Sequence, residues 1–183
     1  NIDVQNIFNE YGIIKFEVIE SFLKNITKKY FHEENISFKK FYKKTGKDLR
    51  MTGTNITIRK GEIFSKTNTP DMMIIDAIKI STCIPYIFTK VEYNGNYYVD
   101  GSITNGYPWK EFKVKKSKKI GIKSIMEDCI NREYNIVEYM NDIISTILSI
   151  TDPKECKIDT IEVRTSCNLV EEHDLSLIHI SEP

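Results

Sequence analysis

The feature that most constrains the fold of this chain is an Asn-Gly dipeptide between two segments rich in aromatic and β-branched residues. Asn94-Gly95-Asn96 separates Ile87–Tyr93 from Tyr97–Val99. Asparagine and glycine adopt the positive φ angles that tight hairpin turns require, so the pattern predicts an antiparallel β-hairpin. The second predicted strand continues directly into Asp100-Gly101. The sequence therefore places a carboxylate at the end of a strand.

Helix and strand patterns alternate along the rest of the chain. Apolar residues at three- and four-residue steps predict helices. These helices are Phe16–Tyr30, a short one between Ser37 and Gly46, one that begins at Thr69-Pro70-Asp71 and ends near Pro85, and Tyr134–Ile150. The predicted strands are Leu49–Ile58, Glu62–Ser65 after a turn at Lys60-Gly61, Lys119–Ser124 after a polar connector at Trp109–Lys119, and Thr160–Arg164. This alternation predicts a layered α/β domain.

Composition narrows the class of protein. The 183 residues fit one domain with a real hydrophobic core. With 26 basic and 26 acidic side chains the formal charge is zero, which argues against a nucleic-acid binder. No apolar run reaches the length of a bilayer span. The four cysteines (Cys83, Cys129, Cys156 and Cys167) have no metal-ligand spacing and are expected to be idle thiols.

The two ends of the chain look unlike those of a natural protein. It begins at Asn1 without an initiator methionine. The tail 175–183 corresponds to the translation of a transposase adapter used in sequencing libraries, so we expect it to be non-native and exclude it from fold reasoning. The expected native domain is therefore 1–174, cut at both ends.

Asp100-Gly101 by itself indicates a turn, because Asp-Gly is a common turn dipeptide and glycine tolerates tight backbone conformations. The motif is, however, the last of three spaced blocks. The first comprises Phe38, Phe41-Tyr42, Thr45-Gly46-Lys47, Leu49 and Thr54-Asn55, the second comprises Asp76-Ala77, Ser81 and Ile84-Pro85 with Phe88 beyond, and the third is Tyr97–Pro108. In order and spacing these blocks resemble the patatin-like family of lipid acyl hydrolases over roughly residues 36–108.

The resemblance implies a patatin-like three-layer α/β/α sandwich and a phospholipase or esterase that needs no metal or cofactor. In that family a serine in a G-x-S-x-G elbow attacks the lipid ester, and an aspartate is the base that activates it. By this resemblance Asp100 is the proton acceptor of a Ser-Asp dyad, and Asp100-Gly101-Ser102 is its motif. Asn105 is expected to support the loop through side-chain-to-backbone bonds, and Pro108 to end it.

The chain also departs from the family pattern. It contains no G-x-S-x-G and no glycine-rich oxyanion loop, both of which lie upstream of the matching region in the family. We therefore expect an N-terminally truncated, inactive fragment whose nucleophile lies outside this chain. A patatin-like pseudoenzyme that binds lipid or a protein partner is the alternative, and a generic α/β domain with Asp100 on an exposed turn is a third. Ser102 stands where the family has glycine or alanine, and its place beside Asp100 is not the geometry of a nucleophile elbow.

Two further features have competing interpretations. The lysine run Lys113, Lys115, Lys116, Lys118 and Lys119 would be attracted to an anionic membrane, but a solvated turn is the simpler interpretation. The apolar stripe of Tyr134–Ile150 is typical of core packing rather than of membrane contact.

Ser81 is expected to serve helix packing. The expected location is the cytoplasm or the periphery of a membrane, with a lipid ester as substrate.

Overall fold

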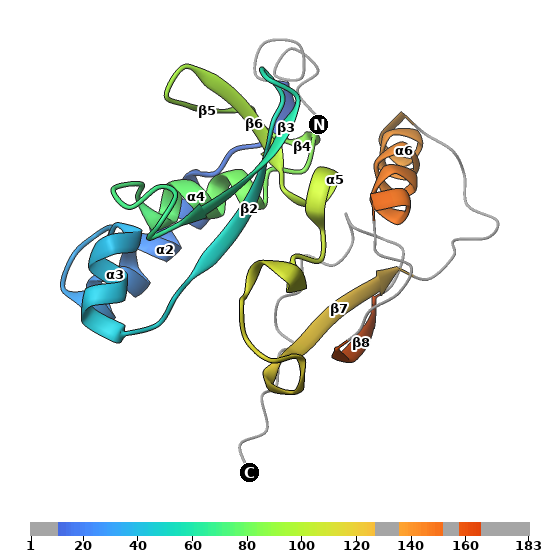
Figure 1. Ribbon diagram of the computed structural model, residues 1–183. Helices are drawn as coiled ribbons and strands as arrows, with labels where there is room; N and C mark the ends of the chain where they lie inside the picture. The colour runs from blue at the N-terminus through green and yellow to red at the C-terminus, as the bar shows by residue number, and fades with distance from the viewer. Residues whose placement is uncertain (1–10, 127–135, 152–157, 166–183) are drawn as a thin grey trace. The chain divides into compact units, whose positions relative to one another are not determined.

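The computed structural model describes residues 11–126, 136–151 and 158–165. The contacts divide these residues into two compact units (Figure 1). The first holds residues 11–108 and 136–151, and the second holds residues 109–126 and 158–165. Helices and strands occur in the first unit and strands in the second, which confirms the predicted α/β class.

A four-stranded antiparallel sheet forms the centre of the first unit. It contains β2 (Arg50–Asn55), β3 (Lys60–Ser65), β5 (Val91–Tyr93) and β6 (Asn96–Asp100), in the order β3-β2-β6-β5. The predicted hairpin is confirmed, because β5 and β6 join through Asn94 (φ 50°) and Gly95 (φ 74°), the positive angles of a two-residue turn. Gly53 of β2 lies opposite Asp100, so the predicted strand end is held inside the sheet.

The predicted strand Ile87–Tyr93 is in fact two strands. Its beginning forms β4 (Tyr86–Phe88), which pairs in parallel with β1 (Gly12–Ile14), whereas its end joins the hairpin as β5. The Thr89 N–H donates to the carbonyl oxygen of Ile14 at 3.0 Å, which continues the parallel pairing. The predicted strand is divided because its beginning pairs with β1, which comes much earlier in the chain. The local pattern of residues does not reveal such a distant partner.

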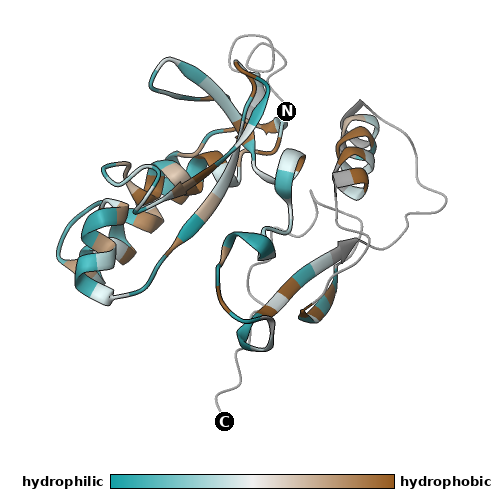
Figure 2. Cartoon of the chain, viewed as in Figure 1, coloured by the Kyte–Doolittle hydropathy of each residue, from teal (hydrophilic) through white to brown (hydrophobic). Residues whose placement is uncertain are grey.

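The helix α4 (Ile74–Ser81) supplies much of the core. Ile74, Ala77 and Ile80 are buried at three-residue steps, and the helix contacts β2 and β6. Burial of each isoleucine stabilises the fold by about 1.5–3 kcal/mol, which outweighs the weak helix propensity of β-branched residues. Figure 2 shows α4 as one of the more hydrophobic helices. The buried residues of this core are Ile36, Phe38, Phe64, Met72, Ile74, Ala77, Ile80 and Tyr98.

Two helices precede the sheet, as predicted. The helix α3 (Phe38–Thr45) begins at Ser37, whose hydroxyl accepts the Lys40 N–H, and ends at Gly46 with φ 67°, so both predicted caps are confirmed. The helix α2 (Glu17–Phe31) matches the predicted Phe16–Tyr30. Its apolar face is only partly buried, because Phe22 remains 63% exposed.

Two predicted boundaries are wrong. Lys60-Gly61 lies within β3, because the turn between β2 and β3 falls at residues 56–59. Thr69-Pro70-Asp71 is not a helix entry, since α4 begins at Ile74 without a side-chain cap. The Thr69 hydroxyl instead accepts the N–H of Ser65 at 3.1 Å, and its N–H donates to the Ser65 carbonyl at 2.9 Å. These bonds close the turn after β3, so the hydroxyl that would cap a helix is already used.

The second unit contains a parallel pair of strands, β7 (Ile120–Met126) and β8 (Asp159–Thr165), which confirms both predicted strands. The predicted connector before β7 forms two short 3-10 turns, Trp109–Glu111 and Lys116–Lys118. Hydrophobic and more polar residues alternate in β8 and in the first part of β7 (Figure 2).

The helix α6 (Ile136–Thr151) belongs to the first unit and confirms the predicted helix, although Tyr134 lies outside the described residues. Of its apolar stripe Ile144 is buried, whereas Ile143 and Ile147 stay 43% and 39% exposed. Core packing is therefore confirmed at Ile144. No helix of the described residues is long and apolar enough for a bilayer crossing. The tail 175–183 and three of the cysteines (Cys129, Cys156 and Cys167) lie outside the described residues, so those expectations stay predictions.

Candidate active site

The backbone of Asp100 is held on both sides by residues from the other two sequence blocks. Its N–H donates to the carbonyl oxygen of Cys83, two residues after Ser81, at 2.8 Å. Its own carbonyl oxygen accepts the hydroxyl of Thr54 at 2.9 Å. Thr54 belongs to the first block, and Cys83 lies inside the second. Three segments far apart in the sequence thus converge on one aspartate at the end of β6.

Gly101 is required here for space rather than for backbone freedom. Its angles are φ −66° and ψ −22°, which any residue adopts, so the predicted conformational reason for this glycine is wrong. A Cβ at this position would overlap the side-chain oxygen and the backbone carbonyl of Thr52. Glycine therefore allows the chain after Asp100 to turn directly against β2.

Ser102 fixes the carboxylate of Asp100. Its N–H and its hydroxyl donate to the same carboxylate oxygen, Oδ1, at 2.7 and 2.6 Å. These bonds form the turn that leads into the one-turn helix α5 (Ser102–Asn105), which is the structural role expected of an Asp-Gly turn. Among the described residues no hydrogen bond reaches Oδ2. One oxygen is thus used to orient the group, and the other remains able to take a proton.

The environment of Asp100 disfavours its charge. Burial raises the pKa of this carboxyl above its usual 3.8, and the two hydrogen bonds from Ser102 oppose the rise. The side chain is partly buried, which contradicts the alternative of an exposed turn. Burial, with the nearby charge of Asp100 as the second cause, also raises the pKa of the Cys83 thiol to about 12. Cys83 is therefore a buried, protonated thiol, as expected of an idle cysteine.

The loop after Asp100 is held by threonines and by backbone bonds. The Thr54 and Thr104 hydroxyl oxygens lie 2.9 Å apart. The Thr104 hydroxyl also lies 3.4 Å from the Gly101 carbonyl oxygen, so the two threonines connect β2 to this loop whichever hydroxyl donates to the other. Asn105 supports the loop through its backbone N–H, which donates to the Gly101 carbonyl at 2.8 Å. We find no side-chain bond of Asn105 within the described residues, so its predicted support comes from the backbone instead.

A family model described as patatin-like phospholipase matches residues 3–113. This range covers all three sequence blocks and the residues whose hydrogen bonds hold Asp100, namely Thr54, Cys83 and Ser102. The chain belongs to the patatin-like phospholipase family.

Two viral proteins are among the relatives of this patatin-like chain. It is 38% identical over 114 residues to the probable lipid hydrolase 463L of Invertebrate iridescent virus 6, which covers 61% of this chain and 39% of that protein. It is 30% identical over 116 residues to the uncharacterized protein R571 of Acanthamoeba polyphaga mimivirus, which covers 63% of this chain and 38% of that protein. The alignment thus spans about two fifths of each relative.

A polar cluster of Asn55, Glu62 and Tyr98 connects the strands that carry the patatin-like motif. The Asn55 amide donates to the hydroxyl of Tyr98 at 3.1 Å and to Glu62 at 3.0 Å. Tyr98 donates to the other carboxylate oxygen of Glu62 at 3.1 Å. Burial, followed by the hydrogen bond to Glu62, raises the pKa of Tyr98 to about 12. These three side chains join β2, β3 and β6, the strands that carry Thr54 and Asp100.

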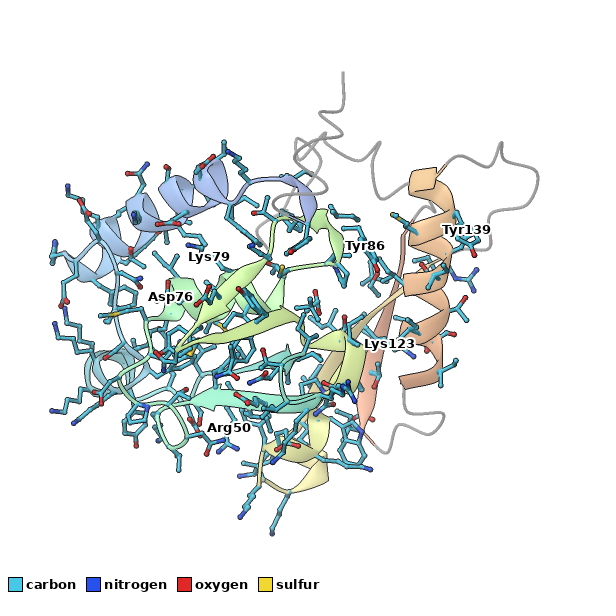
Figure 3. The ribbon with its side chains drawn as sticks, turned by 90° about the horizontal axis from the view of Figure 1, so that it is seen from above. Arg50, Asp76, Lys79, Tyr86, Lys123 and Tyr139 are labelled. Carbon is cyan, nitrogen blue, oxygen red and sulfur yellow. The ribbon has the colours of Figure 1, made fainter. Side chains whose placement is uncertain are left out.

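Other residues of the patatin-like blocks have structural roles. Lys79 and Asp76 extend from α4 near α2 (Figure 3), where Lys79 binds Glu20 at 2.6 Å. Burial raises the pKa of Asp76, while the charge of Lys79 lowers it. Glu20 also binds Lys24 at 2.8 Å, so these charges join the two helices. Ser81, the last residue of α4, is partly buried.

No other group in the described residues forms a competing site. We find no group of three or more His, Cys, Asp or Glu side chains that would hold a metal ion in that part of the chain. A surface hollow near the junction of α2 and α3 contains none of the residues around Asp100. It is lined by Tyr30, Phe31, His32, Lys44 and Thr45.

The sequence pointed to Asp100 but assigned no role at this site to Thr52, Thr54 or Cys83. Thr54 belongs to the Thr54-Asn55 pair of the first block, so the sequence did contain a signal that could have pointed to this residue. Thr52 leaves no room for a side chain at position 101, and Cys83 contributes its backbone carbonyl, which accepts the Asp100 N–H. Neither contribution depends on a recognisable side-chain pattern.

Proposed function

We propose that the intact protein is a serine-type lipid acyl hydrolase in which Asp100 is the base of a Ser-Asp dyad. The observation that carries the proposal is the convergence of three spaced patatin-like blocks on the backbone of Asp100. An Asp-Gly turn with a purely structural role needs only the local hydrogen bonds between Asp100 and Ser102. The additional bonds from Thr54 and Cys83, which come from two other segments, are not needed for such a turn.

The chemistry proposed for Asp100 is proton transfer at Oδ2. As a serine hydroxyl attacks the carbonyl carbon of a lipid ester, its proton passes to Oδ2 and the carbonyl electrons move to the oxygen. When this tetrahedral adduct collapses, the proton passes to the departing alcohol and an acyl-serine remains. Water then repeats the two steps, and the fatty acid is released. A raised pKa makes the carboxylate a stronger base than an exposed aspartate would be.

The nucleophile is proposed to lie in sequence that this chain does not contain. No G-x-S-x-G occurs among the 183 residues. The alignment with each relative leaves about three fifths of that relative uncovered, which is ample length for a nucleophile segment. Ser102 is not proposed for this role, because its hydroxyl is directed at Asp100 Oδ1.

The experiment is to label the full-length protein with a serine-reactive fluorophosphonate and to measure its hydrolysis of phospholipid and of short-chain esters. We expect labelling, and we expect Asp100→Asn to reduce kcat/KM by about 10²–10⁴-fold, the usual contribution of a general base. Asp71→Asn is the matched control, because Asp71 is exposed and precedes α4 outside the site. A protein that binds lipid but neither labels nor hydrolyses would be the pseudoenzyme. Full activity in Asp100→Asn would exclude Asp100 as the base.

A further inference from the structure

The segment Trp109–Lys119 concentrates positive charge in a chain that has none overall. It contains six lysines and one glutamate, so its net charge is +5 within eleven residues. The complete chain has 26 basic and 26 acidic side chains. The rest of the chain is therefore acidic on balance, and this segment is a distinct positive region.

Some lysines of the helices form ion pairs with glutamates, whereas none is found for the described lysines of this segment among the described residues. In the first unit Lys24 and Lys79 pair with Glu20, and Lys40 and Lys44 pair with Glu33. In Trp109–Lys119 no lysine whose side chain is described forms an ion pair with a described residue. Those lysines are Lys110, Lys113, Lys115, Lys118 and Lys119, and all but Lys119 are exposed. The ammonium groups of Lys110, Lys113, Lys115 and Lys118 thus lie on exposed side chains.

Apolar side chains lie between these charges. Val114 is 53% exposed between Lys113 and Lys115, and Phe112 is 37% exposed. Trp109 is partly buried, and its ring lies 5.6 Å from the ammonium of Lys110 and 5.4 Å from that of Lys119. Side chains that combine apolar bodies with lysine ammonium groups are typical of the interface between headgroups and acyl chains.

Short turns keep the segment compact. The Lys118 N–H donates to the carbonyl oxygen of Lys115 and the Val114 N–H to that of Phe112, both at 2.9 Å. The ammonium of Lys119 donates to the carbonyl oxygen of Trp109 at 2.7 Å, which ties the two ends together. The segment is thus a closed loop that presents lysines and Val114 outward. A solvated turn explains the exposed lysines, and Val114 adds an exposed apolar side chain between two of them.

We propose that Trp109–Lys119 binds the surface of membranes that contain anionic lipids, with Val114 and Phe112 among the headgroups. The proposal rests on the proposed function in taking lipid as the substrate. It adds that the substrate is presented at a negatively charged interface. Nucleic acid fits less well, because the rest of the chain is net acidic and would repel a long polyanion.

The test is binding of the full-length Asp100→Asn variant to sedimented vesicles. Phosphatidylcholine vesicles are compared with vesicles that also contain phosphatidylserine. We expect binding that requires phosphatidylserine and weakens as salt screens the charges. The triple variant Lys113→Ala/Lys115→Ala/Lys118→Ala should bind roughly 100-fold more weakly, since each lysine near such a surface contributes roughly fivefold. Val114→Ser should also weaken binding, at every salt concentration.

The matched control is Lys39→Ala/Lys43→Ala/Lys47→Ala, which removes the same charge from exposed lysines of α3 and the residues after it. Its binding should equal that of the parent. Equal binding to both kinds of vesicle, an unaffected segment variant, or tighter binding to single-stranded RNA than to vesicles would each overturn the proposal. Because a variant without the proposed base is used, this result is independent of catalysis. Absence of esterase activity in the wild-type full-length protein would contradict the proposed function and leave this inference standing.

Discussion

The hydroxyl oxygen of Ser102 lies 2.6 Å from Oδ1 of Asp100, in a position where the patatin-like pattern has glycine or alanine. The hydroxyl bond is therefore an addition to that pattern. It acts on the same oxygen as the Ser102 N–H, and both bonds lower the pKa of Asp100 against the effect of burial. In this chain the carboxylate is both more firmly oriented and more acidic than its burial alone would make it.

Ser102→Ala should move the acid limb of the pH profile. Without the hydroxyl bond the pKa of Asp100 rises further, so kcat/KM of the full-length enzyme should begin to fall at a higher pH than in the wild type. The rate on the alkaline side should change little, because the backbone bond from residue 102 still orients Oδ1. Ser117→Ala, an exposed serine of the second unit, is the control and should keep the wild-type profile. A profile that stays in place in Ser102→Ala would show that the hydroxyl has no influence on the base.

Thr54→Val tests the contact between the first block and Asp100. The substitution keeps the side-chain shape but leaves the Asp100 carbonyl without its hydroxyl donor. We expect a loss of about 1–3 kcal/mol in the free energy of unfolding from the unsatisfied buried acceptor. A displaced carboxylate should lower kcat/KM by up to about 10²-fold. Urea unfolding and ester hydrolysis measure the two effects.

Thr67→Val is the control for this substitution, because Thr67 is exposed in the turn after β3. It should change neither quantity. If Thr54→Val lowers stability but leaves kcat/KM unchanged, Thr54 supports the fold without positioning the base.

How much of this site was predictable depends on how local each interaction is. The hairpin, the caps of α3 and the position of Asp100 at a strand end follow from neighbouring residues, and all are confirmed. The reason for Gly101 could not be predicted, since Thr52 comes from a different strand. The helix entry at Thr69 was wrong because a nearby turn uses the same hydroxyl. Local signals thus located the candidate aspartate, while the contacts that hold it could be seen only in the fold.

Gly101→Ala should be destabilising, whereas Gly106→Ala should be tolerated. Both glycines have ordinary right-handed helical angles, with φ −66° at Gly101 and −71° at Gly106. A methyl group at Gly101 would overlap Thr52, while one at Gly106 would meet Ser102 Cβ at 3.4 Å. Overpacking of this kind costs about 1–3 kcal/mol. Thermal unfolding of the two variants measures the difference, and equal stability would show that the loop can move away from β2 freely.

Asp100→Asn should make the protein more stable at neutral pH while it lowers kcat/KM. Because burial raises the folded-state pKa of Asp100 above 3.8, the folded state holds more protons than the unfolded state between these two values. Stability of the wild type therefore falls as pH rises through this window, and it stays lower above it. Asparagine has no charge to desolvate, and its Oδ1 can accept both bonds from Ser102.

We expect Asp100→Asn to gain about 0.5–2 kcal/mol in the free energy of unfolding at pH 7, the usual range for such replacements. The gain should vanish below pH 3.8, where the wild-type carboxyl is neutral in both states. Urea unfolding across this pH range measures it, with the exposed Asp71→Asn as the control that should show no gain. A variant that is less stable at pH 7 would mean that the charge of Asp100 holds the fold together, and the retention of this aspartate would then have a structural explanation in place of a catalytic one.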